Sequence, residues 1–210
     1  MDRTSDPTTA GDGSTSDGLR TEVDEHRDPN HDIDPLFVNR WSPRTMTGAQ
    51  LDEDELLSLF EAARWAPSSY NNQHWRFVYA TPDHDQWDDF EDLLAEGNRE
   101  WASDAAALVV VLSKTTFDHN DEPAPTHSFD TGAAFENLAL EGARRGLVVH
   151  GMQGFDYDGA RELFALTDEY DVEAMAAIGV HDEDDAPDDE QPNQRKELNK
   201  IVFAGEFTPN

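Results

Sequence analysis

A loop rich in hydroxyl and amide side chains follows Pro67, in the stretch "PSSYNNQHW". Its serines, asparagines and glutamine are uncharged groups that both donate and accept hydrogen bonds. The chain has 46 acidic and 15 basic residues, so most of its polar side chains are carboxylates. An uncharged polar loop is therefore unusual here and is a candidate ligand-binding segment.

Two pairs of cationic residues are the second candidate for chemistry. Arg40 and Arg44 bracket "RWSPR", which contains Ser42, whereas Arg195 and Lys196 lie in "NQRKEL" after the most acidic loop. Ordinary salt bridges account for a single arginine of this kind. Two basic pairs beside serine and proline turns instead fit a small phosphate ligand, which is held by bidentate arginines and by hydroxyl or backbone donors.

Other catalytic motifs are weaker. The turn "HGMQGFD" (150–156) has free backbone N–H groups but, taken alone, is better explained as a plain strand-to-helix turn. His119 and His127 flank an acidic loop without zinc or calcium spacing, which favours a solvated loop. Ser68 and Ser69 lie outside a GxSxG motif, and the chain has no cysteine. An enzyme with this sequence would therefore use a cofactor for its chemistry.

The composition excludes several classes of partner. A formal net charge of −31 argues against nucleic acid and anionic membranes, which attract basic surfaces. No run approaches the roughly 18 apolar residues of a membrane span, and we expect a cytoplasmic protein. Acidity extends through the whole chain and only three residues are lysine, which indicates adaptation to molar salt. The alternative is an ordinary acidic protein with an acidic tail.

The elements that must position these residues follow from hydrophobic periodicity. Residues 1–34 are expected to form a disordered acidic tail, and 35–210 the folded domain, with about 175 residues for a core. Asp52 and Glu55 predict a capping box for a helix that buries Leu56, Leu57 and neighbouring residues and ends at Pro67. Further helices are expected at 84–97, 128–146 and 156–166, and strands at 75–80, 106–113, 147–152 and 173–180. This order indicates helices and strands layered around one sheet.

Five segments, in this order and spacing, resemble the FMN-dependent nitroreductase family: "NRWSPRTM", "EAARWAPSSYNNQHWRFVYA", "GNREWASDAAALVVVLS", "DTGAAFENLALEGARRGLVVHGMQGFD" and "AIGV". The loop after Pro67 and the turn at 150–156 are the most specific of them. The resemblance implies an α+β fold with a central mixed, mostly antiparallel sheet flanked by helices. It also implies an intertwined homodimer that binds two FMN molecules at the subunit interface.

The resemblance assigns the basic residues to the flavin. By position, Arg40 and Ser42 match residues that hold the flavin phosphate, and Arg195 matches a later phosphate-binding arginine. Arg44 matches the cation near N1 and O2 of the flavin ring. The two basic pairs would then converge on one phosphate, although they lie far apart in the sequence.

The resemblance also explains the amide-rich loop. Ser68, Ser69 and Asn71 match a loop that reaches the flavin from the partner subunit, without bringing a carboxylate to the phosphate. His74 stands where the family usually has proline, so a less rigid loop is expected. The helix from 129 to 145 is rich in small residues, and this composition makes it a candidate for close packing at the dimer interface.

The turn at 150–156 is assigned in the same way. Gln153 and Gly154 match the turn whose backbone N–H faces flavin N5, and Asn98 matches a ring-contacting asparagine. Gln153 occupies a position where a small residue is common and is expected to narrow the pocket. No side chain is assigned as catalytic.

The implied activity is ping-pong hydride transfer from NADH or NADPH, through flavin N5, to a nitroaromatic, quinone or similar conjugated acceptor. One alternative is a family member specialised for flavin degradation or dehalogenation. A second is a flavin-binding protein without turnover, and a third is a purely structural acidic domain. Reduction of bound FMN by a nicotinamide nucleotide separates the enzymes from the other two.

Overall fold

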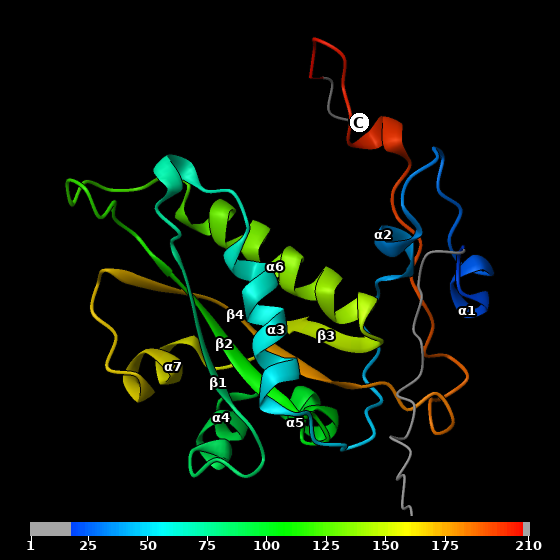
Figure 1. The fold of residues 1–210 in the computed structure, drawn as a ribbon, viewed down its shortest axis with the longest axis horizontal. Helices are drawn as coiled ribbons and strands as arrows, with labels where there is room; N and C mark the ends of the chain where they lie inside the picture. The colour runs from blue at the N-terminus through cyan, green and yellow to red at the C-terminus, as the bar shows by residue number, and fades with distance from the viewer. Residues whose placement is uncertain (1–17, 208–210) are drawn as a thin grey trace, which may run out of the picture.

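The computed structural model describes residues 18–207 and contains one four-stranded sheet (Figure 1). Its strands are β1 (Trp75–Ala80), β2 (Ala107–Lys114), β3 (Leu147–Met152) and β4 (Tyr170–Val180). Their order across the sheet is β1-β2-β4-β3, and every neighbouring pair is antiparallel. All four expected strands are confirmed, and among the described residues the sheet is antiparallel rather than mixed.

Seven helices surround this sheet in the described part of the chain, so the α+β class is confirmed. They are α1 (Thr21–Asp24), α2 (Pro35–Asn39), α3 (Glu53–Arg64), α4 (Trp87–Leu93), α5 (Glu96–Ala102), α6 (His127–Arg144) and α7 (Tyr157–Leu163). Short 3-10 turns lie at Ser69–Asn71 and Leu198–Lys200. None of the helices in residues 18–207 has both the length and the apolar character needed to cross a membrane.

The sheet is covered on both faces, with α3 and α6 on one side and α4 and α7 on the other (Figure 1). In β2, Val109 and Val111 face the α3/α6 side, whereas Leu108 and Val110 face the α4/α7 side. Alternate side chains of a strand point to opposite faces, so a strand covered on both faces must be apolar throughout. This explains the unbroken apolar run that predicted β2.

Two details of α3 differ from the prediction. Asp52 is the N-cap residue, but its side chain makes no capping hydrogen bond, so the expected capping box is absent. Leu57 is 43% exposed, whereas Leu59 is fully buried against the sheet. The buried stripe of α3 therefore runs through Leu56, Leu59 and Ala63.

The small residues of α6 serve packing within this chain. Gly142 lies so close to β3 that a Cβ atom there would be 2.7 Å from the Val149 side chain. Ala134 and Ala139 are also buried, in the cluster that includes α3 and the sheet. These residues bring α6 close to its own sheet, and any partner surface on α6 must use its other face.

Part of the segment that was expected to form a disordered tail packs against the folded domain. Residues 1–17 lie outside the described residues, but residues 18–34 contain α1, whose Val23 is fully buried. Arg27 is only 8% exposed. The packed part of the chain therefore begins before residue 35.

Candidate functional site

The basic segment after α2 lies against β3. Arg40 ends α2, and its Nη1 lies 3.4 Å from Ser42 Oγ, which in turn donates to the Val149 carbonyl at 3.4 Å. On its other side, Arg40 Nε lies 3.6 Å from a carboxylate oxygen of Glu136 on α6. Arg40 and Ser42 are thus adjacent, as a shared phosphate site requires.

Arg195 lies in the same region as Arg40. The pKa of the buried Arg27 is lowered to about 10, first by burial and then by the positive charges of Arg195, Arg40 and Arg20. Two arginines from distant parts of the sequence therefore lie close to one side chain. Within residues 18–207, no carboxylate lies at salt-bridge distance from Arg27 or Arg195. The arginine cluster (Arg20, Arg27, Arg40 and Arg195) is a local positive region in a strongly acidic chain.

The backbone at Arg44 is held by a carboxylate. Glu190 accepts hydrogen bonds from the Arg44 N–H at 2.5 Å and the Thr45 N–H at 3.2 Å, and it lies 3.3 Å from His181 Nε2. Burial raises the pKa of Glu190, but these hydrogen bonds outweigh burial, and the net shift is downward. The Arg44 side chain itself is exposed, so its cation is available to a ligand.

His150 connects the same segment to the sheet. Its Nδ1 lies 2.9 Å from the Pro43 carbonyl, so this nitrogen carries the proton and donates. Its ring packs against Trp101, with 4.6 Å between centroids. Burial lowers the pKa of His150, and the Arg44 charge lowers it further. A neutral imidazole thus fixes the loop that carries Ser42 and Arg44.

Asn98 and the turn after β3 form a second group. The Asn98 side chain donates to the Gly154 carbonyl at 2.9 Å, and the Ala95 N–H donates to the same oxygen at 3.0 Å. Gln153 is exposed beside this contact. Three predicted site residues (Asn98, Gln153 and Gly154) therefore lie together at the end of β3.

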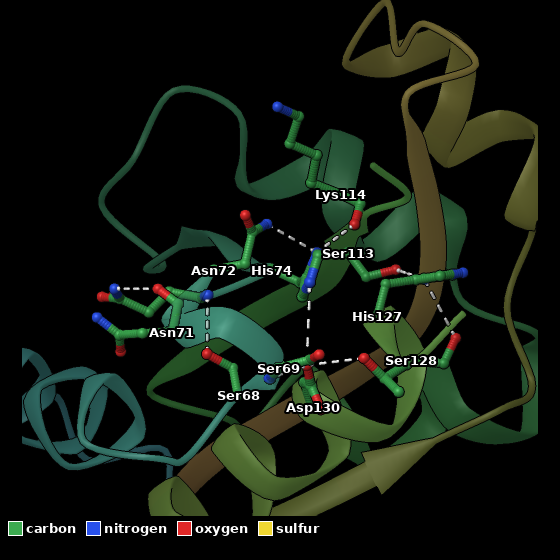
Figure 2. Close-up of polar contacts among 12 residues, drawn as sticks. Ser68, Ser69, Asn71, Asn72, His74, Ser113, Lys114, His127, Ser128 and Asp130 are labelled. Carbon is green, nitrogen blue, oxygen red and sulfur yellow. Dashed lines mark hydrogen bonds and ion pairs between the residues drawn. The ribbon is translucent and has the colours of Figure 1, made fainter. Parts of the chain in front are cut away.

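Hydrogen bonds join residues within the amide-rich loop (Figure 2). Its backbone is also strained. Ser68 Oγ accepts from the Gln73 N–H at 3.0 Å, and the Gln73 side chain donates to the Asn71 carbonyl at 2.9 Å. Tyr70, Asn71 and Gln73 all have φ between 52° and 54°, a region that non-glycine residues seldom occupy. Strain of this kind persists only where surrounding contacts impose it.

His74 and Asp130 supply such contacts, as Figure 2 shows. His74 is fully buried, and its Nδ1 lies 2.7 Å from the Lys114 carbonyl. Its Nε2 lies 3.9 Å from a carboxylate oxygen of Asp130, and that oxygen accepts from the Ser69 N–H at 2.9 Å. His74 was expected to loosen the loop, but instead it links the loop to β2, while Asp130 links the loop to α6.

The two histidines that flank the acidic loop do not lie together. His127 Nδ1 is 2.7 Å from Ser113 Oγ, which also bonds to Glu173. His119 packs against the rings of Tyr70 and Phe117 instead. His127 therefore belongs to a hydrogen-bonded group at Ser113, whereas His119 belongs to an aromatic cluster.

Comparison with known proteins identifies the family. The sequence profile of the nitroreductase family matches residues 38–100 and 87–180, which include most of the site described above. The chain belongs to the nitroreductase family. A 15.4 kDa uncharacterised protein from the ask 5′ region of Mycolicibacterium smegmatis is 32% identical over 121 residues, which is 55% of this chain and 80% of that protein.

Solved structures resemble this nitroreductase-family chain over most of its length. One, described as an oxidoreductase containing FMN, is 41% identical, with a TM-score of 0.82 over 88% of this chain and 97% of that one. Another, from Desulfovibrio desulfuricans, was solved in complex with FMN. It is 21% identical, with a TM-score of 0.65 over 82% of this chain and 96% of that one, and supports the fold alone.

In this nitroreductase-family chain the predicted site residues fall into separated groups. Asp130, which holds Ser69, and Glu136, which pairs with Arg40, are six positions apart on α6, about 9 Å along its axis. Figure 1 shows α2 near the carboxyl half of α6 and the loop before β1 near its amino end. A single chain therefore does not bring Ser68, Ser69 and Asn71 to the arginine cluster.

Four residues that support the site were missed from the sequence: Arg27, Asp130, His150 and Glu190. Arg27 lies in a segment whose composition predicted disorder, and Glu190 is one of many carboxylates in an acidic loop. His150 belongs to the turn that was singled out, so its position was a usable signal. Asp130 bonds to Ser69, 61 positions away, and no pattern in the local sequence predicts this contact.

Proposed function

We propose that this protein is an FMN-dependent oxidoreductase that takes a hydride from NADH or NADPH. The acceptors would be nitroaromatics, quinones or similar conjugated molecules. The observation that carries the proposal is that buried Arg27 joins the Arg40 and Arg195 segments in a chain of net charge −31. Arg27 donates to the Arg40 carbonyl at 2.8 Å and to the Asn193 carbonyl at 3.0 Å, and this second oxygen also accepts from Arg195 Nη1 at 3.1 Å. The similarity to an oxidoreductase that contains FMN supports the choice of cofactor.

The donor set fits the phosphate of FMN. Arg20 and Arg40 lie at salt-bridge distance from Glu22 and Glu136, whereas Arg27 and Arg195 have no such carboxylate among residues 18–207, so part of the positive charge of the cluster is unpaired there. A bound phosphate would offset this charge and accept charge-assisted hydrogen bonds from Arg40, Arg195 and Ser42. Each such bond is worth about 1.5–3 kcal/mol.

The ring end of the site would be formed by Arg44 and by the Asn98–Gly154 contact. When bound, FMN supplies hydride chemistry that no side chain of this protein can perform. The protein's part is to bind the ring, orient it and supply positive charge from Arg44. Asn98 fixes the carbonyl of Gly154 and so orients the peptides of that turn.

We further propose a homodimer in which the loop at 68–71 of one subunit completes the site of the other. The loop contains Tyr70, which is 80% exposed, and its Ser69 N–H bonds to Asp130, next to Phe129, which is 81% exposed. An exposed patch of this kind is typical of a protein interface. No hydrogen bond within residues 18–207 uses the Asn71 side-chain amide, so it is available to a ligand or a partner.

The deciding measurement is the visible spectrum of the purified protein in molar salt, before and after anaerobic addition of NADH or NADPH. Flavin absorbance that bleaches with either nucleotide supports the proposed oxidoreductase. Bound flavin that does not bleach favours a flavin-binding protein or a specialised relative. A colourless protein that takes up no added FMN contradicts the proposal.

Subunit mixing tests the dimer separately. Arg40→Ala impairs the phosphate end, and Asn71→Ala impairs the loop, so each homodimer carries two defective sites. Co-expression of differently tagged variants yields a heterodimer in which one site has both an intact Arg40 and an intact loop. Recovery of FMN binding at one site per heterodimer is expected. A heterodimer that binds no better than its parents contradicts a site shared between subunits.

A further inference from the structure

We infer that Arg27 is a positioning residue for the phosphate end of this site, and that the segment from 18 to 34 is part of the FMN-binding unit. The inference rests on the proposed FMN function. It concerns a segment whose composition predicted a disordered tail. Three hydrogen bonds that the buried Arg27 guanidinium donates to backbone carbonyls support this inference.

Arg27 joins three segments of the chain. Its Nη1 donates to the Val38 carbonyl at 2.5 Å and to the Arg40 carbonyl at 2.8 Å. Its Nε donates to the Asn193 carbonyl at 3.0 Å, across 166 positions of sequence. Asn193 lies two residues before Arg195, so the same side chain holds the backbone beside both predicted phosphate arginines.

A second set of contacts docks the same segment onto α2. The Arg20 N–H donates to Asn39 Oδ1 at 2.9 Å, and Arg20 Nη2 donates to the Asn39 carbonyl at 2.7 Å. Asn39 is buried and donates in return to the Gly18 carbonyl at 3.1 Å. These bonds hold the residue immediately before Arg40, so the N-terminal segment fixes the Arg40 backbone from two sides.

Arg27 lies where burial and neighbouring charges both disfavour its own positive charge. It is 8% exposed, and its pKa is lowered to about 10, first by burial and then by the charges of three neighbouring arginines. None of the carboxylates in residues 18–207 lies at salt-bridge distance from Arg27, although the chain has 46 acidic residues. A guanidinium that orders two basic segments and adds to their positive potential suits a site for an anion.

Arginine is required at this position by geometry. The planar guanidinium has five N–H donors in a fixed fork, so it can reach carbonyls on two separate segments at once. Lysine carries the same charge as a compact ammonium on a flexible stem. Arg27→Lys therefore keeps the charge and loses the link, whereas Arg27→Met loses both.

The test compares FMN with riboflavin, which has the same ring and ribityl chain but no phosphate. Dissociation constants for both flavins are measured by fluorescence titration on the full-length protein and on Arg27→Lys and Arg27→Met. Arg161→Met is the matched control, because Arg161 also donates to two backbone carbonyls, Tyr170 at 2.7 Å and Thr167 at 3.2 Å, but lies at α7 outside the arginine cluster. Thermal unfolding is recorded for each variant.

We expect both Arg27 variants to lose affinity for FMN by about tenfold or more, with riboflavin affinity changed less than threefold. Arg161→Met should lower thermal stability and leave the ratio of the two affinities unchanged. FMN binding by Arg27→Lys that equals the unsubstituted protein would overturn the inference, because charge alone would then suffice. An equal loss for both flavins would also overturn it, because a general loss of structure would explain that result. Failure of the unsubstituted protein to bind FMN would overturn the proposed function, and this inference with it.

Discussion

The Asn98 side chain lies directly on the backbone of Gly154: its Nδ2 is 2.9 Å from the Gly154 carbonyl, and a Cβ atom on Gly154 would lie 2.8 Å from that nitrogen. Real Cβ atoms do not come as close as 2.8 Å to another atom, so glycine at position 154 leaves the room that the Asn98 side chain occupies. Both were assigned to the flavin ring by family resemblance, and the structure brings them together. The contact holds the turn after β3 against the start of α5.

Gly154→Ala should displace Asn98 and distort this turn. We expect a loss of about 1–3 kcal/mol in the free energy of unfolding, as for other overpacked sites, together with weaker FMN binding. Gly97→Ala is the matched control, because a Cβ at Gly97, one residue before Asn98, meets nothing within 4 Å. Urea unfolding and FMN titration check both variants. A Gly154→Ala protein that binds FMN normally would contradict the role of this contact.

Arg40→Ala and Arg195→Ala should each weaken FMN binding by about ten- to a hundredfold, because a charge-assisted phosphate contact is worth about 1.5–3 kcal/mol. Arg64→Ala, at an exposed residue of α3, removes the same charge elsewhere and should have little effect. Isothermal titration with FMN measures the three constants. Unchanged affinity in both Arg40→Ala and Arg195→Ala would rule out the phosphate assignment.

Asp130→Ala should release the strained loop. Asp130 is 5% exposed and accepts from the Ser69 N–H and the Thr126 hydroxyl, so its removal leaves two partly buried donors without this partner. We expect the free energy of unfolding to fall by about 1–3 kcal/mol, and proteolysis within the loop to accelerate. Glu100→Ala, at an exposed position of α5, is the control for loss of one carboxylate. Equal protease resistance of the loop in the two variants would contradict this role.

His150 should make stability depend on pH on the acidic side of neutrality. Burial lowers its pKa from the ordinary value of 6.5, and the Arg44 charge adds to the effect. Below pH about 6.5 the unfolded chain binds a proton that the folded chain resists, so stability falls as the pH drops through this window. His150→Gln should flatten the dependence.

The measurement is the free energy of unfolding between pH 7.5 and about 5, with both proteins in the same salt. The pKa of Glu190 is lowered below 4.5 by its hydrogen bonds, so this carboxylate contributes stability that is lost only at lower pH. The difference between the two proteins over this pH range therefore measures the contribution of His150 to the pH dependence of stability. Identical slopes in the two proteins would exclude His150 as the source.

The charge of the chain predicts that salt stabilises the fold. A net charge of −31 produces repulsion that molar salt screens to about 3 Å. We expect the thermal midpoint to rise steadily from 0.1 M to 2 M KCl. A midpoint that stays constant or falls over this range would contradict adaptation to high salt. FMN affinity should fall over the same range, because salt also screens the phosphate contact.

Several elements were predictable because their cause is local. The β2 segment is an apolar run that must be covered on both faces, and the sequence around Pro67 and Gly154 carries the family pattern. The break between α4 and α5 was not predictable, because it comes from outside the segment. Leu94 is extended and pairs with Phe155, and this pairing ends α4 before the helix can continue.

In the candidate site, too, some features follow from the local sequence and others depend on contacts between distant segments. The sequence by itself determined the strands, the family and the residue types of the loop after Pro67, because these depend on local hydrophobicity and on motif order. Only the tertiary structure decided that Arg27 joins the Arg40 and Arg195 segments and that His74 anchors the loop instead of loosening it. Such contacts join residues as far as 166 positions apart, and the composition of residues 18–34 gave no sign of them. Their energy comes from burial and hydrogen bonding between segments that only the folded chain brings together.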